Sequence, residues 1–273
     1  MHGPLSPDER AQIRRLPFIS RAREHRLYAV DGTRWADCWL DGGRALLGHR
    51  PAGLGQRIKN ELDRGLTAPY PSRWEARLGK ALHALFPGYA AIRIYRNPEA
   101  AARAVGLPAP PADPLDAPPA VPAGNAVPAP ALWGRPLLPD HPPAERLFPV
   151  LPTASFGALQ PVLFAEEPRD ADASDLLPPM ALAALARACR LCLAAGASPE
   201  AGNAPDSAGS ADIWEKRGPY LLFRGAEAEY DRLFDALFHR RILIAPSAGR
   251  PTILPFTATP KETAALLRGG APE

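Results

Sequence analysis

The sequence predicts an α/β fold, with α+β character in its smaller part and a small mixed sheet covered by helices. Two observations support this: hairpin, helix and strand patterns follow one another over residues 26–105, and residues 214–268 repeat a strand, helix, strand order. Between these blocks, a proline-rich stretch lacks hydrophobic periodicity. The chain has 273 residues and is 46% hydrophobic, which is enough for a folded core.

The N-terminal block opens with a predicted β-hairpin, in which residues 27–30 and 34–40 flank Asp31 and Gly32. A helix is expected over 51–65, ending at Gly65. Its buried positions, four residues apart, would be Leu54, Ile58 and Leu62.

A second helix is predicted to begin after Ser72, because Glu75 three residues later completes a capping box. Five apolar residues form its expected buried stripe: Trp74, Leu78, Leu82, Leu85 and Phe86. Pro87-Gly88 ends it, and the alternation over 91–95 then predicts a strand that turns directly into an alanine-rich helix.

Residues 107–130 read LPAPPADPLDAPPAVPAGNAVPAP, which predicts an extended connector without a packed core. Apolar runs around 147–152 and 160–166 suit short strands, and a helix should follow Pro178-Pro179. The last block is expected to contain strand 220–223, helix 227–240, strands 242–245 and 252–256, and helix 260–268. The predicted divisions are therefore an N-terminal segment 1–105, a linker 106–130, a middle block 131–211 and a C-terminal block 212–273.

Composition and charge exclude several classes of protein. The net charge of +3 comes from basic residues spread among similar numbers of acids, which gives no indication of nucleic-acid binding. No uninterrupted apolar run approaches a membrane span, and no secretory signal pattern is present. Three cysteines cannot all pair, so we expect a reducing cytoplasm.

Motifs for catalysis or metal binding are sparse. Cys189 and Cys192 form a C-x-x-C without a second metal-binding half, which favours packing over metal or redox chemistry. The six histidines lack metal-ligand spacing and are interpreted as surface or helix-face residues. Phosphate-binding and nucleophile motifs of the usual glycine-rich types are also missing.

Lysine is restricted to Lys59, Lys80, Lys216 and Lys261. Schiff-base chemistry needs a desolvated lysine amine, which arginine cannot replace. Each of the four is best explained as a solvated charge. Lys216 is the one candidate catalytic lysine, because it lies near the ordered C-terminal block.

The order of these blocks resembles class III aminotransferases, the pyridoxal-phosphate (PLP) enzymes that include glutamate-semialdehyde aminomutase. The resemblance is carried by Asp31-Gly32, Asp37, Gly48-His49 and the helix from Leu54 to Leu62. At the other end, Pro246-Ser247 and the run Thr259-Pro260-Lys261-Glu262 match the family's C-terminal small domain, without its histidine. The matching parts cover about residues 24–105 and 214–268.

The resemblance implies that the turn after strand 91–95 should hold the cofactor phosphate. The family sequence there is N-S-G-S/T-E-A, whereas this chain has Asn97, Pro98, Glu99 and Ala100. Proline removes an N–H donor and the missing residues remove the concave turn, so this vestigial phosphate turn is predicted to be closed.

The resemblance also implies a seven-stranded large domain that carries a lysine for the cofactor and an aspartate for its pyridine nitrogen. Residues 131–211 are too few for that domain and contain no lysine. Asp170, Asp172 and Asp175 are predicted to cap the following helix rather than to serve the pyridine.

These departures predict a truncated, degenerate aminotransferase-like protein without PLP, acting as a binding or regulatory partner of another protein chain in a homo- or hetero-oligomer. The alternative is a PLP-dependent aminotransferase or aminomutase for an amino acid or amino-aldehyde, using Lys216 or a site completed by a partner chain. A third interpretation is an interaction module in which Tyr70, Ser72 and Arg73 bind a small carboxylate. The alternative to this third interpretation is that Trp74 is buried in the core and the Arg73 side chain is simply solvated.

Overall fold

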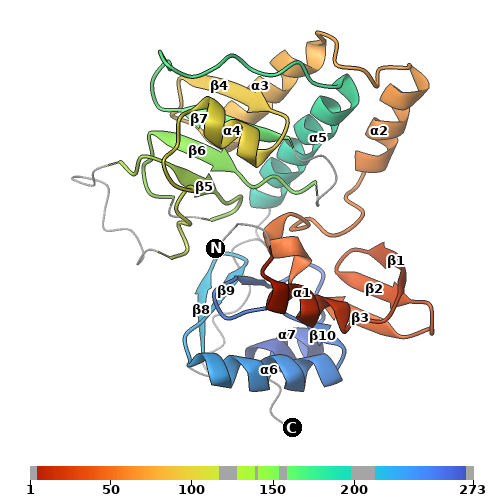
Figure 1. Ribbon diagram of the computed structural model, residues 1–273. Helices are drawn as coiled ribbons and strands as arrows, with labels where there is room; N and C mark the ends of the chain where they lie inside the picture. The colour runs from red at the N-terminus through yellow and green to blue at the C-terminus, as the bar shows by residue number, and fades with distance from the viewer. Residues whose placement is uncertain (1–4, 117–127, 139–140, 154–158, 198–212, 269–273) are drawn as a thin grey trace. The chain divides into compact units, whose positions relative to one another are not determined.

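The computed structural model describes residues 5–116, 128–138, 141–153, 159–197 and 213–268 (Figure 1). The chain forms two compact units. Unit 1 contains residues 1–50 and 198–273, and unit 2 contains residues 51–197. Residues 51–105, which the sequence pattern groups with the N-terminal segment, therefore belong to unit 2. Residues 198–212, which read SPEAGNAPDSAGSAD, lie outside the described residues.

Unit 1 is built on a mixed sheet of order β1-β2-β3-β10 and a smaller antiparallel sheet of order β11-β9-β8. The strands are β1 (Ile19–Arg23), β2 (Arg26–Ala29), β3 (Arg34–Asp37), β8 (Trp214–Arg217), β9 (Tyr220–Phe223), β10 (Ile242–Leu243) and β11 (Thr252–Ile253). The helices are α1 (Pro7–Arg14), α6 (Glu227–His239) and α7 (Pro260–Leu267).

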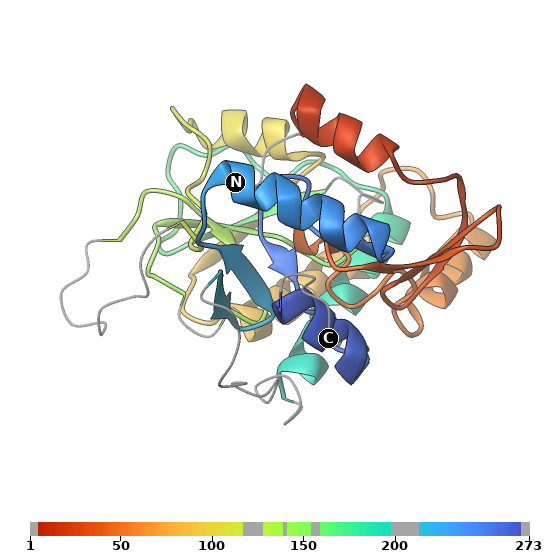
Figure 2. The ribbon, with the colours of Figure 1, turned by 90° about the horizontal axis from the view of Figure 1, so that it is seen from below.

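The predicted hairpin is present as β2 and β3, with Gly32 at φ +82° in the turn between them. The parallel pairing of β3 with β10 joins the two ends of the chain within unit 1. One hydrophobic cluster unites Leu27 and Trp35 of the hairpin with Tyr230 and Leu237 of α6 and Leu266 of α7. Helices α1 and α6 lie side by side in both ribbon views (Figures 1 and 2).

The N-terminal helix α1 and strand β1 were not anticipated from the sequence. Ser6 and Glu9 form a capping box at the start of α1, and Ile13 and Leu16 pack against the core of unit 1. The sequence signal was available as S-P-D-E, with proline at the first helical position.

Unit 2 has three layers. A sheet of order β4-β7-β6-β5 lies in the middle. Its strands are β4 (Ala91–Tyr95), β5 (Leu132–Gly134), β6 (Arg146–Pro149) and β7 (Gln160–Phe164), and its helices are α2 (Leu54–Asp63), α3 (Arg73–Leu85), α4 (Pro98–Ala104) and α5 (Pro179–Gly196). β5 pairs parallel with β6, and the other pairings are antiparallel.

Alternate residues of each strand supply two separate cores. Ile94, Leu147 and Leu163 face the cluster that contains α3 and α5. Their neighbours Tyr95 and Phe148 belong to the cluster formed with α4 on the other face.

Helix α2 departs from its predicted pattern. It ends as expected, with Gly65 at φ +71°, but Leu62 is 46% exposed and Ile58 is only partly buried. Glu61 is instead fully buried, and one of its carboxylate oxygens accepts a hydrogen bond from Arg64 at 2.7 Å. The four-residue spacing predicted the helix but misplaced its inward face by one residue.

The proline-rich connector is more ordered at its ends than predicted. Asp113 and Leu115 are buried, Ala112 bridges to Leu132 of β5, and the Asp113 carboxylate pairs with the buried Arg135 guanidinium. The Arg135 Nε donates to Asp113 Oδ1 at 2.7 Å. Residues 117–127 in the middle of the connector lie outside the described residues.

Helix α5 carries the C-x-x-C as part of its packed face. Cys189 and Cys192 are free and buried, and burial raises the pKa of both thiols, that of Cys192 to about 12. The packing interpretation is therefore confirmed.

In the part of the chain that the structure describes, α5 is also the one helix whose length and hydropathy would allow it to cross a membrane. Leu182, Ala183 and Leu185 of α5 are buried in the core of unit 2, as expected for the central helix of a folded domain.

Candidate functional site

The turn between β4 and α4 is the position at which the resemblance implies a phosphate site. Asn97 caps α4 from an extended conformation, and its side-chain oxygen accepts the N–H of Ala100 at 2.7 Å. The Asn97 carbonyl accepts the N–H of Ala101 at 3.0 Å. Pro98 occupies the first helical position, where its missing N–H and fixed φ are tolerated.

A segment from later in the chain, residues 172–175, lies along this strand and turn. Asp175 donates its N–H to the carbonyl of Ile94 at 2.9 Å, and the Ser174 hydroxyl oxygen accepts the N–H of Ile94 at 3.0 Å. The Tyr95 hydroxyl donates to the Asp172 carbonyl at 2.8 Å. The outer edge of β4 is thus occupied by the chain itself.

The Asp175 carboxylate completes the turn. It accepts the backbone N–H of Arg96 at 2.9 Å and the guanidinium of the same residue at 3.2 and 3.3 Å. The Arg96 side chain and then its backbone N–H hold the pKa of Asp175 below its usual range. Asp175 is therefore an ionised carboxylate placed at the amide where an external anion would need a donor.

The predicted capping role of Asp170, Asp172 and Asp175 is wrong. Helix α5 begins at Pro179 with Pro178 as its cap residue and no side-chain cap hydrogen bond. Pro178-Pro179 is sufficient to start the helix, which leaves Asp175 available for Arg96.

The residues of the turn do not fit the phosphate of PLP. The amides of Arg96, Ala100 and Ala101 already donate within the protein, and Pro98 has none. A dianionic phosphate would also lie against the carboxylate of Asp175. These contacts give a physical basis for the prediction that the turn is closed.

None of the four lysines is fully buried. Lys59 and Lys80 are exposed on α2 and α3, and Lys261 is exposed at the start of α7. Lys216 is half-buried on β8, opposite Leu221 of β9. It belongs to unit 1, whereas the β4–α4 turn belongs to unit 2. Lys216 is therefore not part of the unit that holds the turn, and the two lysines of that unit, Lys59 and Lys80, are exposed.

The loop residues Tyr70, Ser72 and Arg73 precede and begin α3. Ser72 is used by the helix, since its hydroxyl accepts the N–H of Trp74 at 3.2 Å and its own N–H donates to Glu75 at 3.0 Å. Tyr70 is 60% exposed, Arg73 is exposed, and Trp74 is 2% exposed. Trp74 thus lies in the core and Arg73 is exposed, and carboxylate binding by Tyr70, Ser72 and Arg73 stays a prediction.

The motif residues Asp37 and His49 form a polar cluster in unit 1. One oxygen of Asp37 accepts the N–H groups of Trp39 and Leu40 at 2.9 and 2.8 Å, and the other contacts His49 Nε2 at 2.8 Å. These contacts hold a left-handed turn that includes Leu40 and Asp41, at φ +46° and +53°. In this chain the motif has a structural role.

A second cluster in unit 1 was missed. His25 is 1% exposed. Its Nδ1 contacts the Thr257 hydroxyl at 2.7 Å, and its Nε2 contacts a carboxylate oxygen of Glu262 at 3.3 Å. Arg26 donates to Glu262 at 2.6 Å. Burial lowers the pKa of His25 despite Glu262. The surface interpretation of His25 is therefore wrong, and no local pattern could have indicated its burial because its partners lie more than two hundred residues away in the sequence.

Low pH is expected to decrease the free energy of unfolding of unit 1, because it protonates Glu9 and Glu262. Burial would raise the pKa of Glu9, but hydrogen bonds from Arg250, Ser247 and Ser6 outweigh it and lower the pKa to about 2. For Glu262, Arg26 and Thr259 likewise outweigh burial and lower the pKa to about 2. Because both values lie below the ordinary 4.5, the stabilisation is complete above about pH 5 and is lost as the pH falls toward about 2.

Urea unfolding at a series of pH values tests this. Glu9→Gln should lower the free energy of unfolding by about 1 to 3 kcal/mol near neutral pH, because Arg250 is left buried without its carboxylate. The difference from the unchanged protein should shrink as the pH falls. Glu227→Gln, at an exposed position on α6, is the matched control and should leave the pH profile in place. A constant difference at every pH would contradict the assignment.

Comparison with known proteins finds the same fold in solved transaminases. No family model matches the chain. An ω-transaminase from Thermomicrobium roseum superimposes with a TM-score of 0.63 at 14% identity, covering 98% of this chain and 94% of that one. Ornithine δ-aminotransferase from Plasmodium falciparum gives 0.61 at 12% identity, covering 93% and 92%. The chain has the PLP-transferase fold of class III aminotransferases.

Sequence matches are shorter. A glutamate-1-semialdehyde 2,1-aminomutase from Saccharolobus islandicus is 28% identical over 96 residues, which are 35% of this chain and 22% of the relative. A protein of Borreliella burgdorferi described as uncharacterized is 37% identical over 84 residues, 31% of each chain. The match thus spans less than a third of the length of either curated relative. The predicted resemblance and α/β class are confirmed, and the structural similarity extends well beyond the half of the chain that carried the motifs.

Proposed function

We propose that this chain is a non-catalytic protein on the PLP-transferase fold that acts as a binding or regulatory partner of another protein chain. The observation that supports it most is the β4–α4 turn, where the protein's own Asp175 holds the backbone N–H and the side chain of Arg96. The fold is kept while the backbone N–H groups of Arg96, Ala100 and Ala101 are already engaged within the protein, and Pro98 has none.

The lysines support the same proposal. A Schiff base with a cofactor needs an amine that burial or a neighbouring cation keeps partly deprotonated. Lys59, Lys80 and Lys261 are exposed, and Lys216 is half-buried on a strand of the other unit from the turn. The chain therefore lacks a lysine placed for this chemistry within the unit that holds the turn.

The rival proposal is a PLP-dependent transaminase or aminomutase acting on an amino acid or amino-aldehyde. It is favoured by the structural neighbours, which are described as ornithine aminotransferases and ω-transaminases. It requires Lys216 as the reactive amine or a site that a partner chain completes.

We further propose a cytoplasmic location, consistent with three free buried cysteines, and a partner that is neither nucleic acid nor membrane.

A PLP titration of the purified protein separates the two proposals. We expect no saturable change in visible absorbance, and after borohydride reduction no single pyridoxyl-labelled lysine by peptide mapping. Exposed lysines react weakly and without preference, so Lys80→Ala serves as the control for background labelling. Saturable binding with one label, lost in Lys216→Ala, would replace our proposal with the enzyme.

A further inference from the structure

Positive charge is concentrated at one place in unit 1. Residues 10–23, RAQIRRLPFISRAR, contain five arginines and no acidic residue, although the net charge of the whole chain is only +3. Of the neighbouring acidic residues, Glu9 is bound to Arg250 and Ser247, whereas Asp8 and Glu24 are exposed and Glu24 lies 3.9 Å from Arg23, so these two offset part of the charge of the five arginines. The segment therefore presents an excess of positive charge.

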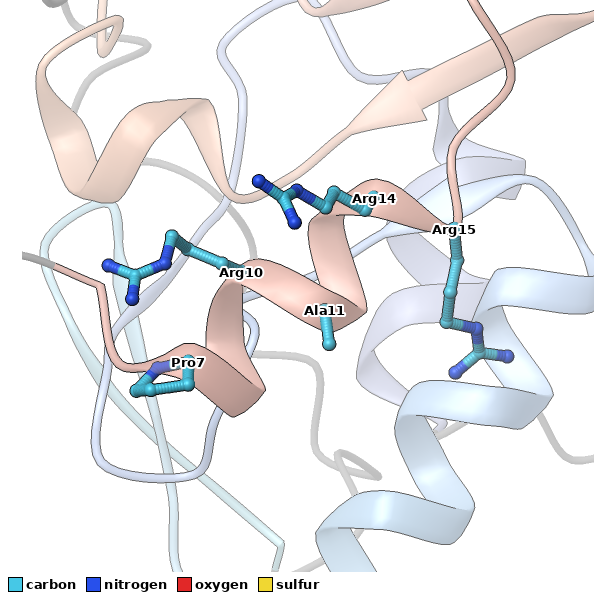
Figure 3. A pocket seen from close by; sticks show the side chains of 5 residues that line it. All are labelled: Pro7, Arg10, Ala11, Arg14 and Arg15. Carbon is cyan, nitrogen blue, oxygen red and sulfur yellow. The ribbon is translucent and has the colours of Figure 1, made fainter.

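Helix α1 is fixed so that two of these arginines face outward. Ile13 and Leu16 pack inward, and Arg15 is tied to α6 through Asp235 at 2.7 Å and the ring of Phe238 at 4.5 Å. Figure 3 shows Arg10 and Arg14 extending from the other side of the helix, away from Arg15. Together with Pro7, Ala11 and Arg15 they line an open hollow of about 490 Å³.

Strand β1, which follows α1 in the chain, has an unpaired edge. It is the outer strand of the β1-β2-β3-β10 sheet, and within the described residues no strand pairs with its outer side. Arg21 and Arg23 are exposed along it, with Arg21 lying 4.2 Å over the ring of Tyr28.

Two apolar side chains stand beside that edge. Phe18 is 89% exposed and Val30 is 72% exposed, and the N–H of Val30 donates to the Phe18 carbonyl at 2.8 Å. Arginines flanking exposed apolar residues on an open strand edge are a common means of preventing unwanted pairing, but they also define which strand could pair there.

We propose that the β1 edge binds an extended acidic segment of a partner protein, which adds to the sheet along β1 with its carboxylates on Arg21 and Arg23 and an apolar side chain against Phe18 and Val30, while Arg10 and Arg14 of α1 add to the positive charge that attracts it. The open backbone edge is what favours a peptide, since neither a lipid headgroup nor a nucleic-acid phosphate offers a matching row of N–H and C=O groups. The inward packing of Ile13 and Leu16 also leaves α1 without an apolar face for a bilayer. The inference rests on the proposed partner function, whose own test is the PLP titration, so a labelled lysine would overturn that function without changing the result below.

Fluorescence anisotropy with a short labelled peptide that alternates glutamate and valine tests the proposal on the full chain. Arg21→Glu combined with Arg23→Glu should weaken binding about tenfold or more. Phe18→Ser should also weaken it without any change in charge. Because these side chains are exposed, the variants should fold, which circular dichroism melting verifies.

Arg169→Glu combined with Arg190→Glu makes the same charge change at exposed positions of unit 2 and should alter the affinity by less than about twofold. Hydrogen exchange should slow at the β1 amides when the peptide binds, which general charge attraction would not produce. Absence of binding, equal weakening in the control pair, or unprotected β1 amides would each overturn the proposal. So would tighter, Arg21- and Arg23-dependent binding to phosphatidylserine vesicles or to single-stranded DNA, which would identify a different class of partner.

Discussion

Arg135→Ala is expected to lower the free energy of unfolding of unit 2 by about 3 to 5 kcal/mol, because it removes the guanidinium that balances the charge of the buried Asp113 carboxylate. Both side chains are almost completely buried, and the paired guanidinium, rather than the burial that opposes it, holds the pKa of Asp113 below its usual range. The pair also fixes one end of the proline-rich connector to β5, so its loss should release that end. Urea unfolding measures the change.

The matched control is Arg93→Ala, which removes an ion pair with Glu167 on the surface. Glu167 is 69% exposed, so the cost should be about 0 to 1 kcal/mol. Replacing both members of the buried pair, as in Arg135→Met with Asp113→Leu, should recover much of the lost stability because no unpaired charge remains. Equal costs for Arg135→Ala and Arg93→Ala would show that the buried pair does not stabilise unit 2.

Gly48→Ala is expected to lower the free energy of unfolding of unit 1 by about 2 to 4 kcal/mol, from backbone strain and overpacking together. Gly48 has φ +84°, and a Cβ there would lie 2.9 Å from the Cα and carbonyl oxygen of Glu24. The neighbouring His49 donates its N–H to that same carbonyl at 2.8 Å, so the backbone cannot move aside without losing a hydrogen bond. Thermal or urea unfolding tests the effect.

Gly32→Ala separates the two contributions. Gly32 has a similar φ of +82°, but no other atom lies within 4 Å of the position that a Cβ would occupy. Its substitution should cost only about 1 to 2 kcal/mol, which is the strain of the left-handed backbone alone. If both variants lost the same stability, the contact with Glu24 would be irrelevant and the glycine of the G-H motif would be needed for its backbone angle alone.

Local sequence determined most of the secondary structure. The hairpin at Asp31-Gly32, the capping boxes at Ser72 and Thr259, and the helix after Pro178-Pro179 all depend on residues within a few positions of one another. The order of these elements was also enough to indicate the PLP-transferase fold. The absence of lysine from residues 131–211 is likewise a property of the sequence alone.

Tertiary structure decided what the polar residues do. Asp175 meets Arg96 across 79 residues, His25 meets Glu262 across 237, and Arg135 meets Asp113 across 22. No helical or strand period links such pairs, because packing of separate elements brings them together. The same applies to Glu61, whose burial depends on how α2 rotates against its neighbours. Proline and glycine patterns thus determined where the chain turns, whereas only the folded arrangement of β4, α4 and residues 172–175 placed a carboxylate of the protein at the turn where the resemblance implied a phosphate.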